Sequence, residues 1–238
     1  MLVLAGVGRR ALLSHWRYPD VYRLRDQLHY CYSGGRAIFL DATDGRYFCL
    51  PATGETAFLA FHKGDANDDQ VGWLRSKNIL IEPDGRLGHN SPSTRGILVP
   101  SEQLEFLGRP TALDIMAATM ARVMVQALLK HRGFEWAYRS VIAAKARHGS
   151  TGESDDSQDP AAIAAAFQAT DLLMGNTNRC LPRSLAFLRL CITRGHLPSL
   201  VLGVRTNPFT AHAWVQIGNK VLNDTVDKVR VFTPILVL

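Results

Sequence analysis

The chain has 238 residues, of which 47% are hydrophobic, and its formal net charge is +6 at pH 7. This length and hydrophobic content allow one or two ordinary globular cores, and we interpret the sequence as two. The arginines are scattered and form no basic stripe interleaved with aromatic residues, so nucleic acid is not the expected partner, although a winged-helix DNA-binding protein stays open.

The chain contains four cysteines, Cys31, Cys49, Cys180 and Cys191. They show no C-x-x-C spacing and no clustered histidines, so we expect neither zinc nor another metal. The apolar segment Met1–Gly8 is too short for the apolar region of a secretory signal, which favours a reducing cytoplasm without disulfides. No G-x-x-x-x-G-K-[ST] phosphate loop is present, so we predict no cofactor and find no support for direct use of ATP.

The N-terminal third predicts a three-stranded meander. Three β-rich runs, near Leu28–Tyr32, Ala37–Asp41 and Arg46–Leu50, are separated by Gly34-Gly35 and by Thr43-Asp44-Gly45. Both separators are hairpin signals.

Two helical stretches follow the meander, from about Thr53 to His62 and from about Asp68 to Lys77. The short run Ile79–Ile81 follows them. Helical spacing directs several apolar side chains inward, namely Ala57, Phe58, Phe61, Val71 and Leu74.

Two segments rich in small and polar residues, Pro83–Pro100 and Gly149–Gln158, are predicted linkers. Between them, Ala112–Leu129 and Phe134–Arg147 predict helices, and Asp159-Pro160 opens another. Charged residues interrupt the run Ala112–Leu129, so we interpret it as a buried amphipathic helix and predict no membrane span. We expect an α+β protein with a small domain at residues 1–90, a linker at 91–104 and a larger domain at 105–238.

Cys180 lies where a helix is expected to begin, because Pro182 is tolerated only in the first turn of a helix. A helix N-terminus lowers the pKa of a thiol and offers free N–H groups to an oxyanion. The cysteine is therefore placed as a nucleophile. A lone cysteine is more often a small buried hydrophobe, and Cys191 on the same helix is our example of that case.

His212 and Asp224 follow on two strand-like runs. His212, Trp214 and Gln216 share one strand face, and Gly218-Asn219 marks a hairpin turn. A two-residue loop would point Asp224 to the wrong side of the sheet. We therefore expect a three-residue loop at 217–219, or a bulge that shifts the strand pairing by the same one residue. Either places Asp224 opposite His212 on the same face. The three residues then have the parts of a Cys-His-Asp triad.

Four motifs in this order carry a resemblance. They are the run from Arg179 to Leu185, then Leu202-Gly203-Val204, then Ala211-His212-Ala213-Trp214-Val215, then Asn223-Asp224. Over roughly residues 105–238 the chain resembles the transglutaminase-like cysteine peptidase of lasso peptide biosynthesis B proteins. The resemblance implies a papain/transglutaminase-like fold and assigns the catalytic triad to Cys180, His212 and Asp224. It also implies removal of the leader from a ribosomally made precursor peptide, whose core then passes to a separate ATP-using macrolactam synthetase.

The N-terminal segment is similar to the winged-helix-like leader-recognition domain of peptide-modifying enzymes, here fused to the peptidase. In that family the leader adds as a strand beside the third strand. The resemblance therefore implies leader contacts at Arg46, Tyr47, Phe48 and Cys49, although Tyr47, Phe48 and Trp73 also suit a simple core.

Two further alternatives of different classes remain open at this point. The same triad serves transglutaminase-like acyl transfer to an amine, because only the group that resolves the thioester differs. A non-catalytic peptide-binding adaptor with a structural Cys180 is the other alternative.

Overall fold

The computed structural model describes residues 22–82, 94, 97–105, 109–148, 160–174 and 180–238. The chain divides into two compact units. The first comprises Met1–Leu28 and Cys49–Ser91, and the second comprises His29–Phe48 and Pro92–Leu238. This division differs from the expected segments, because the strands of the N-terminal meander group with the C-terminal part of the chain. The boundary at residues 91–104 stays a prediction, and both predicted linkers lie largely outside the described residues.

The first unit is built around two helices that pack against each other, α2 (Ala52–Lys63) and α3 (Asp68–Ser76). α2 ends at Gly64 in the left-handed conformation (φ 83°), and α3 begins with a capping box between Asn67 and Gln70. Both predicted helices are confirmed. All five side chains predicted to point inward are buried, namely Ala57, Phe58, Phe61, Val71 and Leu74.

A small antiparallel ladder completes this unit. Its strands are β1 (Arg23–Leu24) and β5 (Leu80–Ile81). β5 lies within the short apolar run at 79–81. β1 was not predicted, because a strand of two residues carries no periodic signal.

The predicted meander is present as β2 (Leu28–Ser33), β3 (Arg36–Asp41) and β4 (Arg46–Cys49). The strands lie in the order β2-β3-β4, so β4 is an edge strand. Gly34 and Gly35 make the first turn, both with positive φ.

The second unit contains a five-stranded sheet in the order β10-β7-β8-β9-β6. β6 and β9 are parallel, and the other neighbouring strands are antiparallel. The strands are β6 (Glu102–Gln103), β7 (Ser199–Arg205), β8 (Thr210–Ile217), β9 (Lys220–Val221) and β10 (Thr233–Val237). A short helix, α7 (Val226–Val229), lies between β9 and β10.

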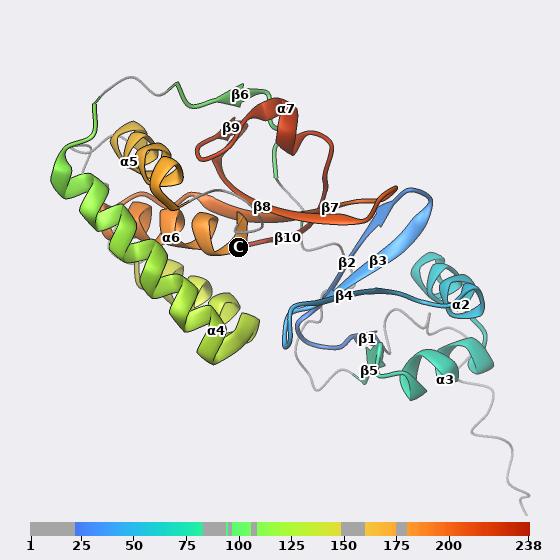
Figure 1. The fold of residues 1–238 in the computed structure, drawn as a ribbon. Helices are drawn as coiled ribbons and strands as arrows, with labels where there is room; N and C mark the ends of the chain where they lie inside the picture. The colour runs from blue at the N-terminus through green and yellow to red at the C-terminus, as the bar shows by residue number, and fades with distance from the viewer. Residues whose placement is uncertain (1–21, 83–93, 95–96, 106–108, 149–159, 175–179) are drawn as a thin grey trace, which may run out of the picture. The chain divides into compact units, whose positions relative to one another are not determined.

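Three helices gather beside one face of this sheet (Figure 1). They are α4 (Ala112–His148), α5 (Pro160–Met174) and α6 (Cys180–Thr193). Gly133 interrupts α4 with a non-helical conformation (φ 71°, ψ −171°), so α4 consists of the two helices that the sequence predicts on either side of this glycine.

The two faces of the sheet have separate apolar clusters. On the α6 side, Leu185 and Leu188 belong to the same core as Ala213 and Val215 of β8. On the other face, Trp214 packs in a second cluster, whose buried members are Val201, Trp214, Val221 and Val229. The alternation predicted for β8 is therefore confirmed.

The segment Ala112–Arg147 of α4 is long and apolar enough to cross a membrane by length and composition, with a mean hydropathy of 1.5 in its most apolar window. Only 22% of that window is buried. These properties are weak support for a membrane span, because core helices of soluble proteins share them, and the predicted absence of a span stays a prediction.

The predicted hairpin loop after β8 is wrong. Gln216 pairs with Val221 and Ile217 pairs with Lys220, which leaves a two-residue loop at Gly218-Asn219. The prediction failed because it assumed that the second strand continues to residue 224, so that strand alternation would decide the side to which Asp224 points. The strand β9 instead ends at Val221, and the chain bends through residues 222–224. Strand alternation therefore does not decide where Asp224 points.

Two helical glycines in the first unit have opposite surroundings. A Cβ at Gly54 in α2 would collide with the ring of Trp73, whereas a Cβ at Gly72 in α3 would meet no atom within 4 Å. We expect Gly54→Ala to destabilise this unit by about 1–3 kcal/mol, because the ring must move. Gly72→Ala should stabilise it by up to about 1 kcal/mol through helix propensity. Urea unfolding measures both changes, and equal effects of the two substitutions would contradict this packing.

Candidate active site

Cys180 is the first residue of α6 and its side chain is half-buried. The described part of α6 begins at Cys180, in agreement with Pro182 in its first turn. The first N–H groups of a helix have no intrahelical acceptor, and the helix dipole favours negative charge at this end. Both effects stabilise a thiolate at Cys180 over a thiol.

His212 comes from β8 and links the thiol to Asp224. Its Nε2 lies 2.7 Å from Asp224 Oδ2, and its ring also hydrogen-bonds to the Cys180 side chain. A carboxylate only accepts hydrogen bonds, so Nε2 carries a proton and donates it to Asp224. This arrangement leaves Nδ1 for the sulfur. The structure thus brings together the three residues predicted as a triad.

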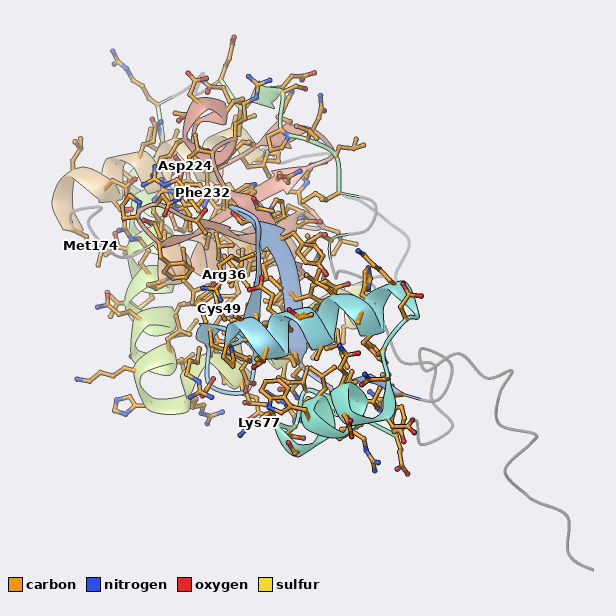
Figure 2. The ribbon with its side chains drawn as sticks, turned by 90° about the vertical axis from the view of Figure 1, so that its right-hand side faces the viewer. Arg36, Cys49, Lys77, Met174, Asp224 and Phe232 are labelled. Carbon is orange, nitrogen blue, oxygen red and sulfur yellow. The ribbon has the colours of Figure 1, made fainter. Side chains whose placement is uncertain are left out.

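Two aromatic rings enclose the imidazole. The ring centroid of Phe232 lies 5.0 Å from that of His212, and Trp214 stacks on it at 6.2 Å. Figure 2 labels Phe232 and Asp224, which both contact His212 from bends of the chain next to the C-terminal sheet. The His212 side chain is only 8% exposed. The two rings therefore restrict the access of water to the His212–Asp224 pair.

The carboxylate of Asp224 has further donors besides His212. Its Oδ1 accepts from the backbone N–H of Thr225 at 2.9 Å, and its Oδ2 accepts from Lys228 Nζ at 3.1 Å. These bonds hold the carboxylate in one orientation and keep it ionised.

A buried polar network connects the elements that carry these three residues. Asn223 Oδ1 accepts from the backbone N–H of Val215 at 2.8 Å, and Asn223 Nδ2 donates to Ser184 Oγ at 2.8 Å. Ser184 Oγ in turn donates to the backbone carbonyl of Ala213 at 2.9 Å. The network joins α6, β8 and the bend that carries Asp224. Sequence reasoning missed this role, although a polar Asn223 directly after the apolar Val221 and Leu222 was a signal.

Arg183 on α6 reinforces the same junction. Its guanidinium donates to the backbone carbonyl of Asn223 and forms an ion pair with Asp171 of α5 at 2.8 Å. Asp171 is shared with Arg122 of α4, at 2.7 Å. All of these charges are largely buried but paired, so they fix geometry without leaving an uncompensated charge. The arginine lay in the motif around Cys180, but its partners are distant in sequence.

The surroundings of Cys180 and His212 shift their pKa values toward an ion pair. Burial by itself raises the pKa of the Cys180 thiol. The hydrogen bond and the charge of His212 lower this pKa, and so do backbone hydrogen bonds at Ala213 and Leu181. The net result is a pKa below the ordinary value of a thiol. Burial lowers the pKa of His212, but the hydrogen bonds to Asp224 and Cys180 and their charges raise it above its ordinary value. The combination favours a thiolate beside an imidazolium.

Cys191 on the same helix provides an internal comparison. It is fully buried, and this burial raises its pKa to about 12. The predicted contrast between a structural thiol and an activated one therefore agrees with the opposite pKa shifts of Cys191 and Cys180.

The predicted leader contacts on β4 face different surroundings. Phe48 stacks on Phe39 with centroids 5.3 Å apart, Arg46 is exposed with its guanidinium 5.8 Å from the Phe48 ring, and Cys49 is exposed. Tyr47 packs on the core that includes Cys180. Burial raises the pKa of Tyr47, and the nearby thiols of Cys180 and Cys31 raise it further. Leader binding at these four residues stays a prediction.

The comparisons with known proteins concern mainly the C-terminal part. A family model described as the transglutaminase-like superfamily matches residues 121–237. The chain is 47% identical over 45 residues to the microcin J25-processing protein McjB of Escherichia coli, a match that covers 19% of this chain and 22% of McjB. No solved structure matches the chain significantly.

The matched residues 121–237 include the nucleophile-bearing helix α6, the strand that carries His212 and the bend that carries Asp224. The mixed helix and sheet fold predicted for this part is confirmed. The C-terminal part of the chain is a transglutaminase-like domain.

Proposed function

We propose that this protein is a cysteine peptidase that cleaves the leader from a ribosomally made lasso precursor peptide. The single observation that supports this proposal most strongly is the hydrogen-bonded chain from Cys180 through His212 to Asp224 at the N-terminus of α6. The transglutaminase-like domain and the local likeness to a microcin-processing protein support a role in lasso peptide biosynthesis. The macrolactam synthetase as a partner is a prediction from the resemblance.

In the proposed reaction, the Cys180 thiolate attacks the carbonyl carbon at the junction of leader and core. The oxyanion that forms is close to the N-terminal end of α6, where the helix dipole favours negative charge and a backbone N–H can donate to it. His212 then gives its Nδ1 proton to the leaving amine, and the C–N bond breaks. The product of this step is a thioester between the leader and Cys180.

The second half of the reaction consumes one water molecule. Neutral His212 takes a proton from the water, and the hydroxide attacks the thioester carbonyl. The leader leaves with a free carboxyl group, and Cys180 returns to the thiolate beside a protonated His212. Asp224 holds the imidazole in the required tautomer through both halves.

The first test is mass spectrometry of a candidate precursor peptide, chosen from short reading frames near the gene of this protein, incubated with wild-type protein and with Cys180→Ala. We expect leader and core fragments from the wild type only, with a loss of about a thousandfold or more in the variant. Cys191→Ala is the matched control, because it removes a thiol from the same helix that has no role in the proposed chemistry. Fragments produced equally by Cys180→Ala would contradict the proposal.

The same experiment separates the alternatives. A leader fragment with a free carboxyl group indicates hydrolysis, whereas a new amide bond to an added amine indicates acyl transfer. An intact precursor that nevertheless binds to the protein favours the adaptor or a missing partner.

The pKa shifts give a second prediction. Asp224→Asn removes the carboxylate that raises the pKa of His212, so the imidazolium is lost at lower pH and the pKa of Cys180 rises back toward its ordinary value of 9.0. Alkylation of Cys180 by iodoacetamide at neutral pH should therefore slow, by about tenfold for each unit that the thiol pKa rises. Peptide mass spectrometry must follow Cys180 specifically, because Cys49 is exposed.

Asp227→Asn is the control for this measurement. Asp227 is an exposed carboxylate three residues further along the chain, and its removal changes the net charge equally. Identical alkylation profiles for Asp224→Asn and Asp227→Asn would refute the role assigned to Asp224.

A further inference from the structure

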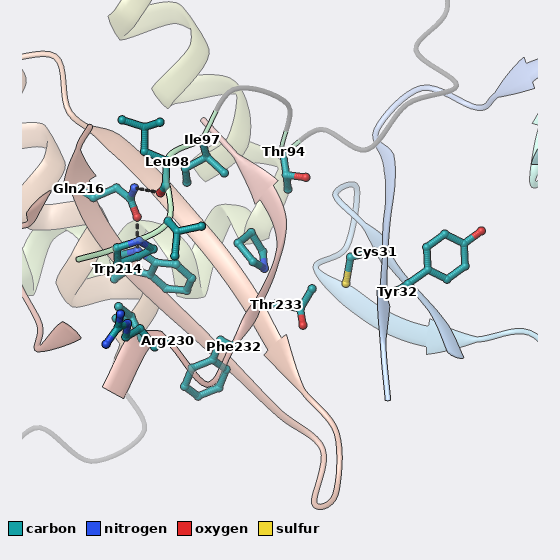
Figure 3. Close-up of a pocket in the computed structure, with 14 residues that line it drawn as sticks. Cys31, Tyr32, Thr94, Ile97, Leu98, Trp214, Gln216, Arg230, Phe232 and Thr233 are labelled. Atoms are coloured by element: carbon teal, nitrogen blue, oxygen red, sulfur yellow. Dashed lines mark hydrogen bonds between the residues drawn. The ribbon is translucent and has the colours of Figure 1, made fainter. Parts of the chain in front are cut away.

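A cavity of about 540 Å³ lies on the face of the C-terminal sheet that is opposite α6 (Figure 3). Trp214, Val229 and Phe232 line it from the sheet and from the segment before β10. The segment 97–100 and the strand β2 contribute the remaining sides. This volume is in the range of ordinary ligand pockets.

The chemistry of the lining favours an apolar occupant. Gln216 is a polar residue of the lining, but its amide is already used. Its Oε1 accepts from Trp214 Nε1 at 2.7 Å, and its Nε2 donates to the carbonyls of Leu98 and Gly218 at 3.1 and 2.7 Å. These bonds fix the indole ring and segment 97–100. The cavity therefore presents a mostly apolar surface, in which Arg230 is the charged residue of the lining.

The cavity shares two walls with the candidate active site. Phe232 and Trp214 line the cavity and also pack on the imidazole of His212. An extended peptide advances about 3.3–3.6 Å for each residue. We therefore expect a substrate residue with its side chain in this cavity to lie a few residues from the carbonyl carbon placed at Cys180.

The strand β2 closes the cavity from the N-terminal part of the chain. Cys31 and Tyr32 are its contributions to the lining (Figure 3). Tyr47 of β4 packs against the same apolar core as Cys180. The meander therefore contributes both to the cavity and to the core beside the nucleophile.

We propose that this cavity binds one large apolar side chain of the peptide substrate, from a residue near the scissile bond, and thereby selects the bond that is cut. The proposal rests on the proposed peptidase function and adds to it a binding site for an aliphatic or aromatic side chain. The strand β2 then has a role in specificity that is separate from leader docking.

The test places a larger side chain inside the cavity by mutation. Thr233 lines it at the start of β10, and Thr233→Phe adds a ring there. Val231 is 51% exposed and is not part of the lining, so Val231→Phe adds a ring close by in sequence but outside the cavity. Both variants and the wild type are given the precursor peptide and a set of its variants, each with one residue within three positions of the cut replaced by alanine.

We expect one position at which alanine lowers the wild-type kcat/KM by about tenfold or more, as is typical for the loss of an apolar side chain from a pocket. Thr233→Phe should cut the unaltered precursor more slowly and lose that preference, while Val231→Phe keeps it. Alkylation of Cys180 should be equal in all three proteins. A Thr233→Phe protein that cuts with the wild-type preference, or a wild type without any such position, overturns the proposal.

A second measurement does not depend on turnover or on the folding of Thr233→Phe. Protein with Cys180→Ala is labelled with 5-fluorotryptophan, and the ¹⁹F resonance of Trp214 is assigned with Trp214→Phe. Saturating precursor should shift this resonance, and the precursor with alanine at the selective position should shift it less. An unmoved resonance in the saturated complex overturns the cavity proposal even if the wild type cleaves, whereas a shift without cleavage by the wild type contradicts only the proposed peptidase function.

Discussion

The arrangement of the candidate site depends on the side chain of Asn223. The strand β9 ends after two residues, and Leu222 N–H still donates to the Val215 carbonyl at 2.8 Å. The Asn223 side-chain amide then accepts from Val215 N–H, where a backbone carbonyl would do so in a regular ladder. The side-chain oxygen thus satisfies the buried Val215 N–H in place of a backbone carbonyl, and the main chain can turn away from the sheet. Asp224 can then approach His212 from the open edge of β8. The same amide holds Ser184, so the position of the carboxylate is tied to the helix that begins with the nucleophile.

The two thiols of α6 show how placement along one helix decides reactivity. Cys180 lies at the helix start beside an imidazole, and its pKa is lowered although it is partly buried. Cys191 lies three turns further along, inside the apolar core, and burial raises its pKa to about 12. Residue type and helix are identical in the two cases. Electrostatic partners and solvent access account for the difference.

The meander changes the interpretation of the N-terminal segment. Its strands contribute Cys31 to the cavity beside His212 and Tyr47 to the core around Cys180. Among the described residues β4 is an edge strand of this sheet, which is the position that strand addition by a leader would use. A sheet that both receives a leader and lines the cleft would couple binding to the position of the cut, because both then use one rigid element.

The sequence by itself determined several helix ends, turns and strand faces of this protein, because these features follow local conformational preferences. Proline in the first turn located the start of α6, glycine pairs located the turns of the meander, and strand alternation put His212, Trp214 and Gln216 on one face. These features depend on neighbours within a few residues. The position of Asp224 did not follow from them, because the strand β9 ends at Val221 and the side chain of Asn223, not its backbone, accepts from Val215 N–H. The partners of Arg183 and the cavity walls also join residues far apart in the chain, so only tertiary packing decided them.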